Sequence, residues 1–482
     1  MRRNRHPQKK RITVIGGGIS GLAAAYELSL RNRNRTRPIE IELLEQAPAV
    51  GGKIVTRREN GVLIEGGPDC FIQEKPWALQ LVRELGLEGE LLNTSAETSG
   101  TFVFDQRALH RLPEGVMMMV PTKPGPFLKS KLFSWPGKLR MAAEVLIPRR
   151  REQGDETLAA FVNRRLGREA LEKLAEPLIA GIHAGDPDNM SLLSTFPRFL
   201  ELEKEYGSLI IGMLKRQRQM RRKLKQQPPA RGPRHTFFIS LKNGLGTLTD
   251  RLAEVIGLEQ IHLQQTVTAL QPTPRGWRIS RREMEPYFSD AVIVAAEAYN
   301  AAKLFDPEMG WLADLLRGIP YVSSATVSLL YPRRAIAHPL DAYGFIVPRI
   351  ARRRIMAMTW SSIKWAGRAP EEMVLMRAFV GGAQQPELAG LGDQTMVNLV
   401  REELEFIMGI TAPPKQKWIY RWPQGMPQYI IGHPDRLIAL DQVMSDNPGL
   451  YLTGAAYRGI GIPDCILQGR RAAARAWQNV TG

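Results

Sequence analysis

The stretch ITVIGGGISGLAAAYEL, residues 12–28, decides the fold. Residues 12–15 are a short β-branched apolar run, which predicts a buried strand, and the pattern from Ile19 to Leu30 predicts a helix with one apolar face. A basic insert at 31–37 precedes a second predicted strand, residues 39–44. A strand, a helix and a strand in this order form a βαβ unit, which implies a parallel sheet.

Three glycines between the first strand and the helix match the G-x-G-x-x-G pattern of dinucleotide-binding turns. Gly16 permits the tight turn, Gly18 lets the backbone approach a pyrophosphate, and Gly21 lets the helix and strand pack closely. The helix N-terminus offers free N–H groups and a positive dipole end to phosphates. Glu45 ends the second strand, where a carboxylate can bind the ribose hydroxyls of an adenosine and repel a 2′-phosphate. The sequence therefore predicts a dinucleotide other than NADP.

Further small residues favour FAD over NAD. Residues 51–53 (GGK) and 65–69 (EGGPD) follow Glu45 closely and allow the chain to run against a large, extended cofactor. Far along the chain, residues 453–455 (TGA) and 459–464 (GIGIPD) precede another predicted helix. A second glycine turn at a helix start suits the flavin end of the same ligand. The alternative is an ordinary strand, loop and helix without a ligand.

The rest of the chain alternates between predicted helices and strands. The patterns predict helices at 76–92, 156–225, 247–256 and 465–478, and strands at 261–270, 277–280, 291–295, 321–331, 374–380 and 450–453. Residues 113–137 are rich in Pro and Met and are expected to be irregular, and Gln226–Pro233 is expected to be a linker.

The charge is strongly basic, at +18 with a pI near 10.0. No acidic residue lies between Glu205 and Asp250, whereas seven lysines and arginines crowd residues 215–225. Such a balance is typical of an anionic partner, such as a nucleic acid, a membrane surface or an acidic small molecule. Aromatic residues are not interleaved with the basic runs, so we expect no nucleic-acid partner and favour solvated faces.

The cysteines and histidines are too few and too scattered for a disulfide framework or a metal site. Cys70 and Cys465 are the two cysteines, so neither a disulfide framework nor a CxxC zinc site can form. The seven histidines are scattered, and no metal site is expected. No signal peptide and no run of about 18 apolar residues is found. We therefore expect a cytoplasmic protein, soluble or peripheral at a membrane.

Several of these stretches carry a resemblance to a known family. VIGGGISGLAAAYEL, ELLEQAPAVGGKIVT, IEGGPDCF and YLTGAAYRGIGIPDCILQGRRAA resemble the amine-oxidase-type flavoprotein superfamily. Residues 176–213 (EPLIAGIHAGDPDNMSLLSTFPRFLELEKEYGSLIIGM), residues 237–254 and the GPDCFIQEK stretch ending at Lys75 are similar to the porphyrinogen oxidases. The chain is most similar to their soluble bacterial branch, the coproporphyrinogen III oxidases, and the resemblance covers nearly its whole length.

The resemblance implies an α/β (α+β overall) fold with three domains. These are a Rossmann-like FAD-binding domain (10–75, 235–298 and 446–482), a mixed-sheet substrate-binding domain (76–112 and 299–445) and a mainly helical domain (113–234). It also implies noncovalent FAD. The residues expected to contact FAD are Gly16, Gly17, Gly18, Ile19, Ser20, Gly21, Glu45, Gln46, Lys53, Glu65, Gly66, Gly67, Pro68, Val267, Trp422, Gly454, Ile460, Gly461 and Ile462.

The implied reaction is the six-electron oxidation of coproporphyrinogen III to coproporphyrin III in haem biosynthesis, with oxygen as acceptor and hydrogen peroxide as by-product. The flavin supplies the redox chemistry, and the protein positions the macrocycle. Lys75 is the candidate catalytic residue, as a cation that pairs with a substrate carboxylate. His183 is a candidate proton carrier and Phe379 a candidate wall of the apolar pocket, although both also suit purely structural roles.

Alternative functions follow from the same motifs. Protoporphyrinogen IX oxidase is the nearest, and carotenoid desaturases and amine oxidases are other members of the superfamily. A non-enzymatic escort protein on the same fold is disfavoured because both predicted cofactor ends carry their glycines. Expected partners are the porphyrinogen and molecular oxygen, with peripheral contact with an anionic membrane and other haem-pathway enzymes as further candidates.

Overall fold

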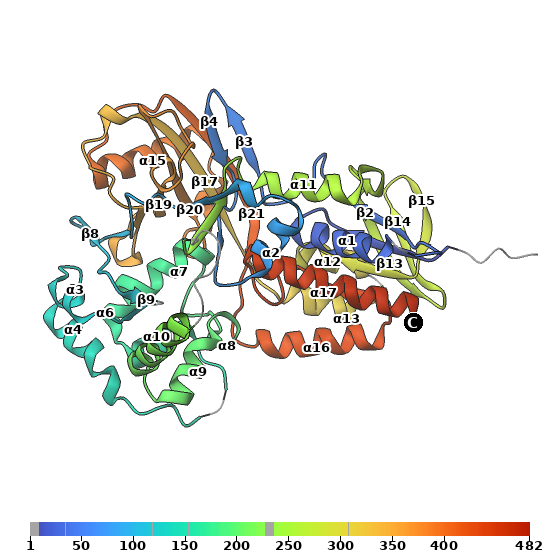
Figure 1. Cartoon of the computed structure of the whole chain (residues 1–482), viewed down its shortest axis with the longest axis horizontal. Helices are drawn as coiled ribbons and strands as arrows, with labels where there is room; N and C mark the ends of the chain where they lie inside the picture. Colours follow the sequence, from blue (N-terminus) through green and yellow to red (C-terminus); the bar gives the residue numbers. More distant parts are fainter. Residues whose placement is uncertain (1–8, 34, 118, 153, 227–235, 307) are drawn as a thin grey trace, which may run out of the picture.

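The structure is a computed structural model that describes residues 9–33, 35–117, 119–152, 154–226, 236–306 and 308–482. It confirms the predicted mixed α/β class. A region built on a parallel sheet lies on the right of Figure 1, a mixed sheet lies at the upper left, and a helical region lies at the lower left. The domain boundaries given above stay a prediction.

The parallel sheet has five strands in the order β12-β2-β1-β16-β22, and every neighbouring pair is parallel. Its strands are β1 (Arg11–Ile15), β2 (Glu40–Leu44), β12 (Ile261–His262), β16 (Ala291–Val294) and β22 (Leu450–Leu452). Helix α1 (Ile19–Asn32) connects β1 to β2, so the predicted βαβ unit is present. Strands from distant parts of the sequence complete this sheet.

Both faces of the parallel sheet are covered, which explains its apolar strands. Ile12 and Val14 face one core with α1, α11 (Gly246–Ile256) and α17 (Ile462–Thr481). Ile15 and Val294 belong to a second core with α12 (Ala298–Phe305) and α13 (Gly310–Arg317). The small sheet β13 (Val267–Thr273), β14 (Gly276–Arg281) and β15 (Met284–Ser289) packs on that second side, and α16 (His433–Asp446) adds to it.

The mixed sheet has seven strands in the order β21-β17-β20-β19-β18-β7-β8. Its strands are β7 (Phe102–Phe104), β8 (Leu109–Arg111), β17 (Tyr321–Pro332), β18 (Gly344–Ile346), β19 (Ile355–Trp360), β20 (Met373–Gly381) and β21 (Gln416–Pro427). Only the β7–β18 pair is parallel. Val327 and Met376 face a core under α15 (Asp393–Met408), whereas Thr326 and Arg377 alternate to the opposite face.

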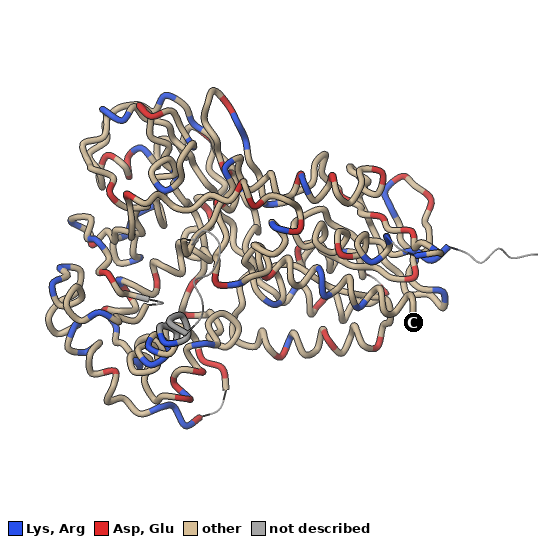
Figure 2. The backbone as a smooth tube through the Cα atoms, viewed as in Figure 1, with Lys and Arg blue, Asp and Glu red and all other residues tan. Residues whose placement is uncertain are grey.

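The helical region comprises α3 (Pro124–Lys129), α4 (Trp135–Ala142), α5 (Leu158–Arg165), α6 (Arg168–Ala170), α7 (Glu176–His183), α8 (Leu192–Thr195), α9 (Pro197–Tyr206) and α10 (Leu209–Gln226). The basic run lies on α10, where Figure 2 shows lysines and arginines gathered. Arg216 pairs with Glu205 at 3.3 Å and Lys215 lies over the Tyr206 ring. Acidic and aromatic groups of α9 therefore engage part of this run.

Several predicted elements differ from those observed. The helix predicted at 76–92 ends early, as α2 (Trp77–Glu84), because Gly86 adopts a φ of +71° and breaks it. A 3₁₀ turn (Glu88–Glu90) and β6 (Leu91–Asn93) follow. The strand predicted at 261–270 is two strands, β12 and β13. The stretch 113–137 includes β9 (Val116–Met117), β10 (Val120–Pro121), α3 and the start of α4.

Other elements were not predicted. They include the hairpin β3 (Thr56–Glu59) and β4 (Val62–Glu65), the sheet of β5 (Phe71–Ile72), β11 (Phe238–Leu241) and β6, and the short helix α14 (Ser361–Lys364). The predicted linker lies outside the described residues apart from Gln226. None of the helices in the described part of the chain combines the length and apolarity that a membrane span requires.

Candidate active site

The turn between β1 and α1 is built for close approach. Gly16 has a φ of +104° and donates its N–H to Leu44 O at 2.8 Å, which closes the turn onto β2. A Cβ on Gly21 would lie 1.9 Å from Gly16 O, so only glycine fits there. A Cβ on Gly18, by contrast, would meet no atom within 4 Å. The space over Gly18 is therefore open, as a pyrophosphate requires.

Glu45 does more than the sequence predicted. Its carboxylate accepts N–H bonds from Gly17 at 2.5 Å and Ala47 at 2.7 Å, and the residue is 9% exposed. It therefore holds the glycine turn as well as lying at the strand end where a ribose would bind. A carboxylate oxygen has spare lone pairs, so both roles are compatible. Its predicted neighbour Gln46 is exposed.

Residues 51–53 lie over the same turn. Gly51 donates its N–H to Gly17 O at 2.9 Å, and a Cβ on Gly52 would lie 3.2 Å from Gly18 Cα. Lys53 forms an ion pair with Glu297 at 2.7 Å. The structure therefore brings the first and second glycine segments together. Val267 lies nearby, in the core that contains Ile15 and Leu44.

The second predicted glycine turn leads into α17, whose N-terminal neighbour Gly461 provides no side-chain cap. Helix α1 also lacks a side-chain cap, at Gly18; its first turn carries no acidic residue, whereas the first turn of α17 carries Asp464. The two helices touch, because a Cβ on Gly469 would lie 2.2 Å from Ser20 O. The uncapped N-terminus of α1 therefore suits an anionic pyrophosphate, and the start of α17 lies beside α1 in the same cradle.

The cradle also leaves a polar atom without a partner. Thr453 Oγ1, at the end of β22, is buried and makes no hydrogen bond within the described residues. Gly454 follows with a φ of +131°, and the predicted contacts Ile460 and Ile462 flank Gly461. Buried hydroxyls are rarely left unpaired in folded proteins. The open space, the uncapped helices and this hydroxyl together fit FAD.

Residues 65–68 lie between the two large sheets. The Gly66 carbonyl accepts bonds from Trp422 Nε1 at 3.0 Å and from Thr326 Oγ1 at 2.8 Å. Trp422, a predicted flavin contact, therefore lies directly against this segment. Arg377 also binds the segment, through the carbonyls of Glu65 and Gly67. It was not predicted, although a charged residue in the apolar strand VLMRAFV was a signal for it.

Lys75 and His183 lie in one neighbourhood. Lys75 forms an ion pair with Asp464 at 2.6 Å, at the start of α17, and its side chain is 40% exposed. Burial, with a contribution from the Lys75 ammonium, lowers the pKa of His183 to about 4. His183 is therefore neutral near pH 7, and Lys75 carries the positive charge here. The Lys75–Asp464 pair was not predicted.

Phe379 lies on the face of β20 that carries Arg377. Its ring is partly buried and packs against the core of the helical region, with the Arg377 guanidinium 4.8 Å from the ring centre. Phe379 therefore lies where the mixed sheet meets the helical region. A role as pocket wall stays a prediction.

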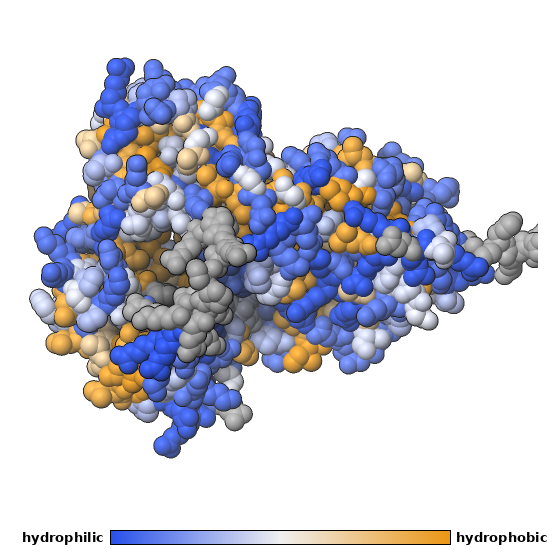
Figure 3. All heavy atoms as spheres, in the orientation of Figure 1, coloured by the Kyte–Doolittle hydropathy of each residue, from blue (hydrophilic) through white to orange (hydrophobic). Residues whose placement is uncertain are grey.

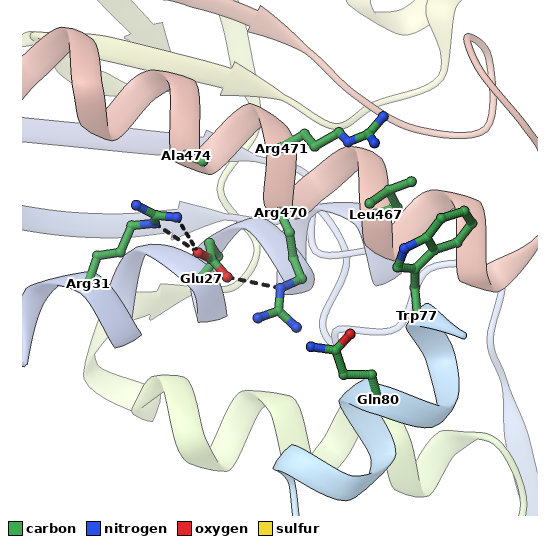
Figure 4. A pocket seen from close by; sticks show the side chains of 8 residues that line it. All are labelled: Glu27, Arg31, Trp77, Gln80, Leu467, Arg470, Arg471 and Ala474. Carbon is green, nitrogen blue, oxygen red and sulfur yellow. Dashed lines mark hydrogen bonds and ion pairs between the residues drawn. The ribbon is translucent and has the colours of Figure 1, made fainter. Parts of the chain in front are cut away.

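A separate surface pocket of about 310 Å³ lies between α1, α2 and α17 (Figure 4). It is lined by Glu27, Arg31, Trp77, Gln80, Leu467, Arg470, Arg471 and Ala474. Glu27 pairs with Arg31 at 2.8 Å and with Arg470 at 2.9 Å. None of the predicted cofactor residues lines this pocket, and its central charges are already paired.

These features define a class of protein. Residues 19–476 match the family model of flavin-containing amine oxidoreductases, and the chain belongs to this family. It is an FAD-dependent oxidoreductase.

Relatives within the family are similar over almost their whole length. The chain is 38% identical to the coproporphyrinogen III oxidase of Bacillus subtilis (strain 168), over 97% of this chain and 98% of that protein. It is 26% identical to the mitochondrial protoporphyrinogen oxidase of Nicotiana tabacum, over 98% and 95%. A crystal structure from Exiguobacterium sp. 255-15, provisionally assigned as a protoporphyrinogen oxidase, has a TM-score of 0.83 and 33% identity, over 96% of this chain and 98% of that one.

Proposed function

We propose that the chain oxidises coproporphyrinogen III to coproporphyrin III in haem biosynthesis, with removal of six electrons, oxygen as acceptor and hydrogen peroxide as by-product. The observation that carries this proposal is the 38% identity to a coproporphyrinogen III oxidase over 97% of the chain. The second candidate is protoporphyrinogen IX oxidation, supported by the more distant plant relative at 26% identity.

In this proposal the glycine turns of α1 and α17 hold FAD, and Lys75 binds a substrate carboxylate. The chemistry that bound FAD supplies is the acceptance of a hydride from a meso carbon of the macrocycle. Lys75 already pairs with Asp464, so a substrate carboxylate would share this lysine with the carboxylate of Asp464. The shared pair is partly exposed, so a single substrate ion pair adds only about 1 kcal/mol or less.

Substrate preference tests the proposal. Coproporphyrinogen carries four carboxylates and protoporphyrinogen two, so a basic rim favours the first. We expect a higher kcat/KM for coproporphyrinogen III than for protoporphyrinogen IX at low salt. Porphyrin fluorescence measures the turnover of both substrates. The ratio should shrink as salt rises, because exposed charges are screened. A higher kcat/KM for protoporphyrinogen IX at low salt would overturn the proposal, and turnover of a carotenoid or an amine alone would place the chain elsewhere in its family.

A variant of Lys75 tests whether this lysine binds a substrate carboxylate. Lys75→Met should raise KM for coproporphyrinogen III more than for protoporphyrinogen IX and leave the FAD content unchanged. The matched control is Lys303→Met, an exposed lysine on α12 that contacts its helix neighbours Asn300 and Tyr299. If Lys75→Met and Lys303→Met have the same KM for coproporphyrinogen III, Lys75 does not bind the substrate.

We also propose peripheral contact with an anionic membrane, through the edge of the helical region formed by residues 128–151. Trp135, Leu139 and Leu146 are 65%, 68% and 82% exposed, an unusual set for so short a segment. Exposed cations flank them, at Lys129, Lys131, Arg149 and Arg151. Figure 3 shows apolar atoms among hydrophilic ones at this lower left edge. Apolar insertion beside cations suits anionic lipid headgroups.

Vesicle binding separates this edge from a solvated face. We expect binding to vesicles that contain phosphatidylglycerol, weaker binding to phosphatidylcholine alone, and loss of binding in Trp135→Ser. Trp311→Ser is the matched control, because Trp311 is 53% exposed on a different helix, α13. If the protein binds neither kind of vesicle, residues 128–151 form a solvated face and do not contact a membrane. Contact with other haem-pathway enzymes stays a prediction.

A further inference from the structure

Three successive backbone carbonyls in the segment Glu65–Gly67 are held by side chains of the mixed sheet. Arg377 Nη1 donates to Glu65 O at 3.0 Å and to Gly67 O at 2.9 Å. Between them, Gly66 O accepts from Thr326 Oγ1 at 2.8 Å and Trp422 Nε1 at 3.0 Å. No carbonyl of this segment is left without a donor.

The donors come from three adjacent strands. Arg377 lies on β20, Thr326 on β17 and Trp422 on β21, and β17 is the central strand of the three. In the register, Arg377 is opposite Ser328 and Trp422 is opposite Ser324, two residues on either side of Thr326. Because side chains alternate along a strand, all three donors project from the same face. That face meets the segment that connects to the parallel sheet.

The segment needs such support because its two glycines lie very close to their neighbours. A Cβ on Gly66 would lie 2.7 Å from the Tyr420 ring, and one on Gly67 would lie 1.9 Å from Lys53 O. Glycine permits both approaches without displacing these neighbours, yet glycine has the largest backbone freedom to lose. The three side-chain donors fix the backbone conformation that the glycines leave free. The shape of the segment is therefore set by the other sheet.

Arg377 is also part of a buried ionic cluster. Asp69 lies 3.7 Å from Arg377 and 3.2 Å from Lys364, and it accepts from Trp365 Nε1 at 3.0 Å. Burial opposes ionisation of Asp69, but Lys364 and Arg377 outweigh it and hold the pKa of this carboxyl well below its ordinary value. Two cations therefore face one carboxylate, which leaves an excess of positive charge beside the segment.

We infer that Arg377 is a positioning residue of the flavin site. From the substrate side it fixes the carbonyls of Glu65–Gly67, and thereby the backbone surface that these residues present to FAD. Its charge, only partly balanced by Asp69, favours the more negative, reduced state of a nearby flavin. The inference rests on the proposed FAD contacts of residues 65–68.

Two substitutions separate geometry from charge. Arg377→Met removes both, so FAD affinity should fall about tenfold or more, because two buried carbonyls lose their donor. The flavin midpoint potential should also become more negative. Arg377→Lys keeps the charge but replaces the planar guanidinium, whose Nη1 bonds both carbonyls, with a flexible ammonium. It should weaken FAD about threefold, less than Met does, and keep the parent potential.

The matched control is Arg165→Met in the helical region. Arg165 is fully buried, donates to Ile147 O and Gly207 O at 2.8 Å each, and pairs with Glu144. Its loss should lower the melting temperature and leave the affinity and potential of FAD unchanged. If Arg377→Met lowers the melting temperature in the same way but changes neither flavin property, Arg377 is merely structural and the inference is wrong.

A milder variant decides the matter if Arg377→Met does not fold. Thr326→Val removes one hydroxyl donor and retains the side-chain shape, so FAD should bind about twofold to threefold more weakly. Parent affinity in both Thr326→Val and Arg377→Lys would overturn the inference. All readouts are FAD binding to apo-protein and the midpoint potential, which need no porphyrinogen. A parent protein that binds FAD but does not oxidise porphyrinogen would overturn only the proposed function.

Discussion

The two glycine segments of the site are held in different ways. The turn at Gly16–Gly21 is held by its own βαβ unit, through the Gly16 bond to Leu44 O and the Gly17 bond to Glu45. The segment at Gly66–Gly67 is held by Arg377, Thr326 and Trp422, which lie more than 250 residues further along the chain. One segment is supported locally, and the other depends on docking of a second sheet.

This difference decides what a substitution should do. Changes in the first segment act on a rigid local turn, so a substitution there either leaves the turn intact or prevents it from forming. Changes in the second segment act through partners that can be altered independently, so their effects should be graded and reparable.

The largest effect is expected for Gly21→Val. Its Cβ would lie 1.9 Å from Gly16 O, so helix and strand cannot pack, and we expect complete loss of FAD and more than about 4 kcal/mol of stability. The flavin-to-protein absorbance ratio and denaturant unfolding of the apo-protein measure both. A yellow protein of parent stability would show that the turn is not rigid.

Gly18→Val should remove FAD without harming the fold. Gly18 has an extended backbone (φ −71°, ψ 175°), and a Cβ there meets nothing within 4 Å. We therefore expect apo-protein stability within about 0.5 kcal/mol of the parent, because the new side chain fills only the space for the pyrophosphate. Full flavin content in the folded variant would contradict the FAD assignment.

Gly66→Ala should have an intermediate, reparable effect. Its Cβ would lie 2.7 Å from the Tyr420 ring, and such overpacking costs about 1–3 kcal/mol. Adding Tyr420→Ala should restore part of the lost stability and FAD affinity, which a double-mutant cycle measures. Gly125→Ala is the matched control, because a Cβ there meets no atom within 4 Å. Strict additivity of the two changes would show that the contact is unimportant.

The smallest effect is a pH dependence at the start of the second segment. Burial raises the pKa of Glu65 above its ordinary value of 4.5, so the folded state retains a proton that the unfolded state loses. The free energy of unfolding should therefore lose this contribution as the pH rises above 4.5. Glu65→Gln keeps one acceptor oxygen for the Leu245 N–H, its amide NH2 can donate to the Thr56 hydroxyl, and it cannot titrate. Its apo-protein should show a more positive change of stability with rising pH than the parent, and identical pH profiles would contradict this.

The locally supported parts of the molecule could be predicted from the sequence. The βαβ unit, its glycine turn and the terminal acid Glu45 follow from apolar periodicity and glycine spacing within about 35 residues, which is the length of one such unit. The second turn before α17 follows from the same local signals. These local signals predicted the parallel sheet, whereas the mixed α/β class of the whole chain was implied by the family resemblance.

Long-range features were missed because their signals are not local. Arg377, and the pairing of Lys75 with Asp464, depend on which strands and helices meet in the fold. The helix predicted at 76–92 failed because apolar periodicity continues past Gly86, where the backbone reverses into positive φ. Strand β21 mixes polar and apolar residues (QKWIYRWPQGMP), so its sequence carries only a weak strand signal.

The order of strands in the parallel sheet has a consequence for biosynthesis. Strand β22 and helix α17, which complete the cradle beside β1 and α1, are translated more than 400 residues after them. A nascent chain therefore exposes its first glycine turn long before the second exists, and on the predicted FAD contacts the cradle stays incomplete until α17 has left the ribosome. Premature termination upstream of α17 should thus yield colourless protein. Flavin retention thereby reports that synthesis has passed α17.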